Sequence, residues 1–169
     1  MKNLLSMKTP VLALFISLVA FGACVSNKQT QPLTDYTQLV NPFIGTDFTG
    51  NTYPGAQAPF GMVQLSPDNG LPGWDRISGY FYPDSTIAGF SHTHLSGTGA
   101  GDLYDISFMP VTLPYQEAEA PLGIYSKFSH ADEEASAGYY RVLLKDYDIN
   151  VELTATERCG IQRYTFPEG

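Results

Sequence analysis

The polar residues best suited to chemistry are concentrated in one segment, residues 89–102, which reads Gly-Phe-Ser-His-Thr-His-Leu-Ser-Gly-Thr-Gly-Ala-Gly-Asp. His92 and His94 are two residues apart, so on a strand both imidazoles would face the same side, as two nitrogen ligands of a metal do. A third ligand could come from Asp102 or Asp105. We favour a role in facing a sugar or lining a site over metal binding. Hydrogen bonding within a buried polar layer is the other alternative.

Two other kinds of catalytic site fit this segment poorly. Ser91 or Ser96 could be paired with a histidine base, but no nucleophile elbow surrounds either serine. Gly97, Gly99 and Gly101 miss the spacing of both the dinucleotide fingerprint and the Walker loop, and no helix signature follows them. These glycines fit a place where the backbone approaches a ligand or another segment closely.

A second candidate site is the aromatic segment 70–82, which contains the single tryptophan, Trp74. An indole presented from a loop can stack on the apolar face of a sugar while Asp75 and Arg76 bond its hydroxyl groups. An ordinary core tryptophan is the alternative. Most acidic residues fall in expected loops or on strand faces, so the sequence shows no buried carboxylate pair for acid–base catalysis.

The elements expected around these segments are short in the first half of the chain. Residues 36–67 are dense in glycine, asparagine and aromatic residues, and three prolines there exclude a helix: Pro42, Pro54 and Pro59. Residues 62–66 alternate enough to predict a strand, and the turn residues 67–70 predict its end.

The second half of the chain is more regular. Residues 138–145, 148–156 and 159–166 predict three consecutive antiparallel strands, with Asp146 and Tyr147 in a tight connection. In the middle strand every second residue is apolar, which predicts one buried face: Ile149, Val151, Leu153 and Ala155. Residues 129–136 predict an exposed acidic loop in preference to one helical turn.

Composition supports one folded, mainly β domain. Of the 169 residues 43% are hydrophobic and 15% charged, and 16 glycines and 12 prolines favour turns over long helices. We therefore predict a twisted antiparallel β-sandwich. The formal net charge of −8 would repel a phosphate backbone, so we expect no nucleic acid partner.

The first residues have the layout of an export signal. Lys2 and Lys8 precede an apolar run at 11–21 that is too short to span a bilayer, and Gly-Ala-Cys24 follows. We predict a lipoprotein signal peptide at 1–23, lipidation of Cys24, and a flexible tether at 24–35. Phe21 departs from the usual leucine, and ordinary secretion is the alternative. The expected location is periplasmic or outer-membrane associated, with a lipid anchor as the only membrane contact.

Four separated segments in fixed order carry a resemblance to a known family: residues 40–46, 50–55, 58–68 and 89–99. Together they resemble the N-terminal region of glycoside hydrolase family 92, the calcium-dependent exo-α-mannosidases. The resemblance extends from Tyr36 to the end of the chain. Since the last expected strand ends almost at Gly169, we expect a fragment that is incomplete at its C-terminus.

The resemblance implies a larger enzyme, in which a β-sandwich at 36–169 precedes an (α/α)6 barrel and the site lies at their junction. It implies removal of terminal mannose from α-mannoside glycans by inversion, which uses two carboxyl groups about 6.5–9.5 Å apart. The family's general acid, general base and Ca²⁺ ligands belong to the barrel, so this chain is expected to hold no catalytic or metal residue and to be inactive alone.

The same resemblance implies that the tryptophan loop and the histidine segment line the mannose pocket. The substrate-binding residues would be Trp74, Asp75, His92, His94 and Asp102. Ala100 stands where many relatives place cysteine, so a role for that side chain does not carry over. We expect specificity for α-1,2 linkages. A non-catalytic carbohydrate-binding module is the main alternative, and a small histidine-based metalloprotein is a third.

Overall fold

The structure is a computed structural model that describes residues 35–97, 99, 103–115 and 123–169. The predicted signal peptide, Cys24, Ala100, Asp102 and all of the tether except residue 35 lie outside the described residues. Within these ranges the chain is mainly β, and its helical elements are short 3-10 turns at η2 (Tyr36–Leu39), η3 (Trp74–Arg76) and η4 (His130–Asp132). No helix in the described part of the chain is long and apolar enough to cross a membrane.

The C-terminal part forms a four-stranded antiparallel sheet. Its strands are β6 (Glu133–Ser136), β7 (Tyr139–Leu144), β8 (Ile149–Ala155) and β9 (Gly160–Thr165), paired in chain order. The three strands predicted here are confirmed to within one or two residues at each end. The predicted alternation is also confirmed, because Ile149, Val151 and Leu153 are buried while the residues between them are partly exposed.

The prediction of an exposed loop at 129–136 is wrong. The segment forms η4 and then β6, whose four residues pair with Tyr139–Val142 of β7. Acidic residues have low strand propensity, so local sequence does not indicate this strand. Tertiary contacts outweigh that propensity, because the side chain of Glu133 is only 1% exposed and is hydrogen-bonded inside the protein.

The first half of the chain forms two smaller sheets. One contains β1 (Ala56–Gln57), β2 (Gln64–Asp68) and β4 (Gly89–Ser91) in the order β1-β2-β4. The other pairs β3 (Thr86–Ile87) with β5 (Ser126–Lys127). All of these pairings are antiparallel, in agreement with the predicted mainly β fold.

The predicted end of the strand before Pro67 is wrong, because β2 continues through Pro67 and Asp68. Pro67 lies opposite Phe90 of β4. The backbone N–H and C=O of Phe90 both bond Phe108 instead, so the missing N–H of the proline is not needed in this pair. This extension places Asp68 two residues after Ser66, on the same face of the sheet.

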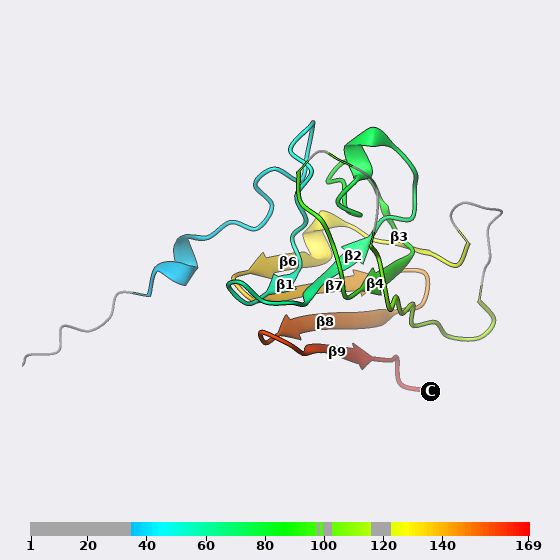
Figure 1. Ribbon diagram of the computed structural model, residues 1–169. Coiled ribbons are helices and arrows are strands. Elements are labelled where there is room, and N and C mark those ends of the chain that lie inside the picture. The colour runs from blue at the N-terminus through cyan, green and yellow to red at the C-terminus, as the bar shows by residue number, and fades with distance from the viewer. Residues whose placement is uncertain (1–34, 98, 100–102, 116–122) are drawn as a thin grey trace, which may run out of the picture. The chain divides into compact units, whose positions relative to one another are not determined.

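An apolar core joins the β1-β2-β4 sheet to the four-stranded sheet. β1 contacts β7 and β8, and β2 also contacts β8; Figure 1 shows β6–β9 in yellow to red beside the green strands of the first half. Leu65, Phe90, Tyr140, Val142 and Val151 are completely buried in this core. One face of β2 and β4 is therefore apolar, and their opposite face is available for polar groups.

A buried polar cluster also connects the two halves. The carboxylate of Glu133 accepts hydrogen bonds from the hydroxyl of Tyr80 at 2.9 and 3.0 Å and from that of Tyr140 at 2.6 Å. His130 Nδ1 lies 2.6 Å from the same carboxylate, and its ring stacks on Tyr82 at 3.9 Å. Burial, together with the charge of Glu133, raises the pKa of Tyr80 and of Tyr140. The expectation of exposed acidic residues is thus wrong for Glu133.

Candidate functional site

The candidate site begins with the polar face of β2 and β4. Leu65 and Phe90 point into the core, so the alternation of a strand places Ser66, Asp68 and Ser91 on the opposite face. His94 lies over this face just beyond the end of β4. Its Nε2 is 2.8 Å from Asp68 Oδ1 and 3.2 Å from Ser91 Oγ. We call Ser66, Asp68, Ser91 and His94 the polar face.

The imidazole of His94 is held on both of its nitrogens. Nδ1 lies 2.7 Å from the carbonyl oxygen of Gln64, which can only accept, so Nδ1 carries a hydrogen and donates it. The His94 side chain is 0% exposed, whereas that of Asp68 is 15% exposed. Asp68 is therefore the member of the pair that reaches solvent.

Ser91, His94 and Asp68 superficially match the residues of a nucleophilic triad. In such a triad the serine and the carboxylate bond opposite nitrogens of the imidazole. Here both face Nε2, and Ser91 is completely buried. The three residues form a buried hydrogen-bonded layer, and they do not have the geometry to activate the serine.

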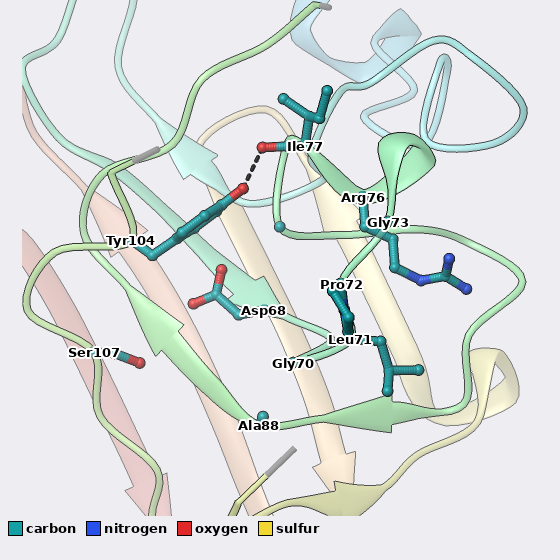
Figure 2. A pocket seen from close by; sticks show the side chains of 11 residues that line it. Asp68, Gly70, Leu71, Pro72, Gly73, Arg76, Ile77, Ala88, Tyr104 and Ser107 are labelled. Carbon is teal, nitrogen blue, oxygen red and sulfur yellow. Dashed lines mark hydrogen bonds between the residues drawn. The ribbon is translucent and has the colours of Figure 1, made fainter. Parts of the chain in front are cut away.

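A cavity of about 520 Å³ opens beside Asp68. Its walls come from the 70–73 loop, Arg76 and Ile77 at the end of η3, Gly79, Ala88, and the segment that contains Tyr104 and Ser107. Figure 2 shows the carboxylate of Asp68 near the centre of the view, between Tyr104 and the 70–73 loop. We call this cavity the Asp68 pocket.

Gly79 is the residue that lets the pocket wall approach the polar face. Its φ is +86°, and a Cβ there would lie 2.5 Å from Asp68 Oδ1 and 3.0 Å from both His94 Cδ2 and Tyr104 Cε1. Tyr104 itself has φ +60°, and its hydroxyl donates to the carbonyl oxygen of Ile77. Non-glycine residues with positive φ are uncommon and are concentrated at functional sites.

The tryptophan segment borders the Asp68 pocket, but its residues are used differently from the prediction. Trp74 is 64% exposed, so the alternative of a core tryptophan is wrong. The guanidinium of Arg76 is engaged by Asp84, with Nε–Oδ2 and Nη2–Oδ1 distances of 2.6 and 2.5 Å, and it lies over the Phe81 ring. The side-chain hydrogen bond to Asp84 raises the pKa of Arg76. Asp75 is partly exposed within η3.

The two predicted histidines do not share one face of a strand, because both lie after β4 ends at Ser91. His92 Nδ1 is 2.9 Å from the carbonyl oxygen of Ile106, and its Cδ2 would be 2.9 Å from a Cβ at Gly160 on β9. The expectation of two imidazoles converging from one strand is therefore wrong. Across the described ranges, no group of three His, Cys, Asp or Glu side chains is placed to hold a metal ion.

Sequence reasoning missed Asp68, which borders the pocket directly. The signal was present, because Asp68 follows Ser66 by two residues and alternation would place both on one face. The intervening Pro67 hid it by predicting a turn. Asp84 was missed as well, and eight residues of separation from Arg76 carry no local signal for that ion pair.

Together, the described residues form an antiparallel β domain with a cavity beside Asp68. Residues 39–169 match the model of the glycosyl hydrolase family 92 N-terminal domain. The chain therefore belongs to glycoside hydrolase family 92 through its N-terminal domain, which confirms the resemblance carried by the four segments.

The relatives are glycosidases. The chain is 49% identical to the family GH92 alpha-mannosidase BT3965 from Bacteroides thetaiotaomicron, solved in complex with mannoimidazole, with a TM-score of 0.73 over 78% of this chain and 18% of that one. The inverting mannosidase BT2199 from the same species is 28% identical, with a TM-score of 0.61 over 82% and 19%. An uncharacterized secreted glycosidase of Arthroderma benhamiae is 30% identical over 89% of this chain and 20% of its own length. The chain thus spans about a fifth of these relatives.

Proposed function

We propose that this chain is the N-terminal part of an exo-acting α-mannosidase that removes terminal α-1,2-linked mannose with inversion, and that it lines the mannose pocket. The observation that carries the proposal is the Asp68 pocket, bordered by the Trp74 turn, in a chain of family 92. The similarity to BT3965 and BT2199 supports mannose as the sugar. In this assignment the chain binds and orients the sugar and excludes water around it.

The reacting carboxyl groups are assigned to a following (α/α)6 barrel. Inversion uses an acid and a base about 6.5–9.5 Å apart. Among the described lining residues, Asp68 is the one carboxylate, and its Oδ1 is already bonded to His94. Asp84, next to Arg76, is tied in an ion pair. A single carboxylate cannot fill both roles, so the fragment alone is expected to be inactive.

The calcium ion is assigned to the barrel as well. The described residues of this chain do not fit it, because they contain no cluster of three candidate ligand side chains. We derive no step through calcium on this chain. The proposal predicts that a chelator stops hydrolysis by the intact protein and leaves the melting temperature of this chain, expressed alone, unchanged.

The proposal includes export as a lipoprotein, with residues 1–23 as the signal peptide, acylated Cys24 as the anchor, and 24–35 as the tether. The secreted relative in Arthroderma benhamiae supports export. The expected location is the periplasm or the outer membrane. Mass spectrometry of the mature protein tests this point, since acylated Cys24 as the first residue is the expected result.

Hydrolysis of α-1,2-mannobiose by the intact protein tests the main proposal, with proton NMR reading the anomer released first. We expect β-mannose from the intact protein and no turnover by residues 25–169. Trp74→Ala should reduce kcat/KM by an amount worth about 1–3 kcal/mol if the indole stacks on the sugar. Ile161→Ala, at another exposed apolar side chain, is the matched control. Turnover by residues 25–169 alone would contradict the assignment of the reacting carboxyl groups to the barrel.

A carbohydrate-binding module without catalysis is the second candidate. The observation that favours it is the exposed Trp74 in η3, the turn that contributes Arg76 to a pocket with a single carboxylate among the described residues. Glycan binding by the intact protein without hydrolysis, in the presence of added calcium, would select this function over the first.

A further inference from the structure

Asp68 presents one carboxylate oxygen that the described part of the protein does not use. Oδ1 is 2.8 Å from His94 Nε2, whereas no described donor bonds Oδ2. The side chain is only 15% exposed, so most of its hydration is removed. A largely desolvated carboxylate oxygen at a cavity wall is a strong acceptor for hydroxyl or N–H groups of a ligand.

The charges around the pocket select a neutral ligand. Arg76 is the cationic residue in the described lining, and Asp84 neutralises it through two hydrogen bonds. An anionic ligand would therefore meet the negative charge of Asp68 without a free cation to balance it. Among the described lining residues, a metal cation would find one carboxylate and no second acidic side chain.

The remaining walls suit a ring with an apolar face and a hydroxylated edge. Leu71 and Pro72 supply exposed apolar surface on one side, and Ser107 places a hydroxyl on the side away from Arg76 (Figure 2). The cavity volume of about 520 Å³ falls within the roughly 300–1,000 Å³ that small-molecule sites occupy. Sugars combine these two kinds of surface, since their C–H faces pack on apolar side chains while their hydroxyl groups donate to carboxylates.

We propose that the Asp68 pocket binds one sugar ring, with Asp68 Oδ2 accepting hydrogen bonds from ring hydroxyl groups and His94 acting as a positioning residue. This inference rests on the proposed function in one respect, the identification of the sugar as mannose. It deepens that function by naming a carboxylate that binds the ligand without taking part in proton transfer.

His94 fixes the carboxylate without touching the ligand. Its ring is bonded to Gln64 through Nδ1, and the rings of Tyr53 and Tyr104 lie 5.1 and 5.8 Å away, centroid to centroid. The imidazole cannot rotate away from Asp68 without breaking these contacts. Asp68 is thereby held in one orientation before the ligand arrives, which lowers the entropy lost on binding.

Isothermal titration of the intact protein with D-mannose tests the site, because the free sugar cannot be hydrolysed. Asp68→Asn should weaken binding at least tenfold. Ala88→Leu leaves Asp68 unchanged but adds a bulky side chain to the pocket lining beside it, and it should abolish binding. Asp105→Asn is the matched control, since Asp105 is exposed and bonds Thr93 outside the pocket. His94→Ala should also weaken binding, and imidazole in the buffer should restore it if His94 acts by positioning.

The outcomes separate the site from the enzyme. Wild-type affinity for D-mannose in folded Asp68→Asn and Ala88→Leu proteins would overturn the site, even if the intact protein hydrolyses mannosides. Binding that depends on Asp68, in a protein without mannosidase activity, would overturn the proposed function and keep the site. If Asp68→Asn does not fold, Ala88→Leu decides alone, because Ala88 is only partly buried at the pocket wall. No binding of D-mannose, D-glucose or D-galactose by the wild type would also overturn it.

Discussion

The four-stranded β6–β9 sheet and the described part of the chain before it, within residues 35–127, are built in different ways; we call the latter the β1–β5 region. Strands β7–β9 are six or seven residues long and pair without interruption, whereas the strands of the β1–β5 region have two to five residues. Non-glycine residues with positive φ follow the same division in the described chain. One belongs to the sheet, Asp148, and six belong to the β1–β5 region: Phe48, Asn51, Phe60, Leu103, Tyr104 and Ile106.

The difference shows where each region gets its stability. The β6–β9 sheet is stabilised by an apolar face and a regular ladder, and its outer face carries a row of alternating charge formed by Glu134, Arg141, Glu152 and Arg163. The β1–β5 region depends on side chains that bond its loops, and the Asp68 pocket lies there. Short strands joined by irregular loops can bring groups such as Asp68 and Arg76 to one cavity. The regularly paired strands of the β6–β9 sheet do not curve around a cavity in this way.

Removal of Glu133 is expected to give the largest effect, because this carboxylate joins the two regions. Glu133→Ala leaves the hydroxyls of Tyr80 and Tyr140 and the Nδ1 of His130 without their buried partner. We expect a loss of about 3–5 kcal/mol in the free energy of unfolding, measured by urea denaturation. Glu134→Ala is the matched control on the same strand.

Glu134 bonds Arg141 on the outer face, where both side chains are about half exposed, at 56% and 46%. Because solvent screens such a pair, Glu134→Ala should lose far less stability than Glu133→Ala. Equal losses for the two variants would show that Glu133 does not connect the regions.

Substitution of Asn69 is expected to give the next largest loss of stability. It tests whether side-chain hydrogen bonds take the place of strand pairing in the β1–β5 region. Its completely buried amide donates to the carbonyl oxygen of Thr86 at 2.8 Å and accepts from the backbone N–H of Phe81 at 2.5 Å. Asn69→Ala should cost about 2–3 kcal/mol by thermal unfolding, because two backbone groups lose their partner. Asn150→Ala, on the partly exposed face of β8, should cost less than about 1 kcal/mol.

The same contrast explains what could be predicted from the sequence. The strands at 139–144 and 149–155 were predictable because one periodicity fixes both the element and its buried face. β6 was not, since its stability comes from pairing with β7 and from the buried contacts of Glu133. In the site, Trp74 and His94 were singled out by residue type. Their roles depend on Gly79, Asp84 and the passage of β2 through Pro67, which are contacts between distant segments with no local signal.

Two glycines with similar φ allow the close packing at the Asp68 pocket to be measured separately from backbone strain. Gly79 has φ +86° and Gly138, in the β6–β7 turn, has φ +77°. Alanine at either position adds the strain of a left-handed residue, roughly 1–2 kcal/mol. A Cβ at Gly79 would also lie 2.5 Å from Asp68 Oδ1, while one at Gly138 meets nothing within 4 Å.

Gly79→Ala should therefore destabilise the protein by about 1–2 kcal/mol more than Gly138→Ala in urea denaturation, because overpacking adds to the strain. It should also weaken D-mannose binding, which Gly138→Ala should leave unchanged. If the two variants lose the same stability, the pocket wall is looser than the structure shows. Close packing at Gly79 would then not distinguish the β1–β5 region from the sheet.

The smallest expected effect is the response of the two regions to alkaline pH. Burial raises the pKa of Tyr53 to about 12, and its hydroxyl donates to Gln57 Oε1 at 2.8 Å. Burial, followed by a hydrogen bond to Glu152, raises the pKa of Tyr139 on the four-stranded sheet, where the side chain is far less enclosed. The folded state favours the neutral phenol in both cases.

The resulting stability is complete below about pH 10, where an unfolded tyrosine is neutral, and it is lost as pH rises through the higher folded pKa. For Tyr53 this window runs from about pH 10 to about 12. In the wild type, the urea concentration at the unfolding midpoint should fall as pH rises through that window. Tyr53→Phe should make this fall smaller. Tyr139→Phe should reduce it less, because solvent screens the exposed phenolate. Equal slopes for both variants would mean that the β1–β5 region is no better shielded from water than the outer face of the sheet. That result would remove the desolvation on which the affinity of Asp68 for a sugar depends.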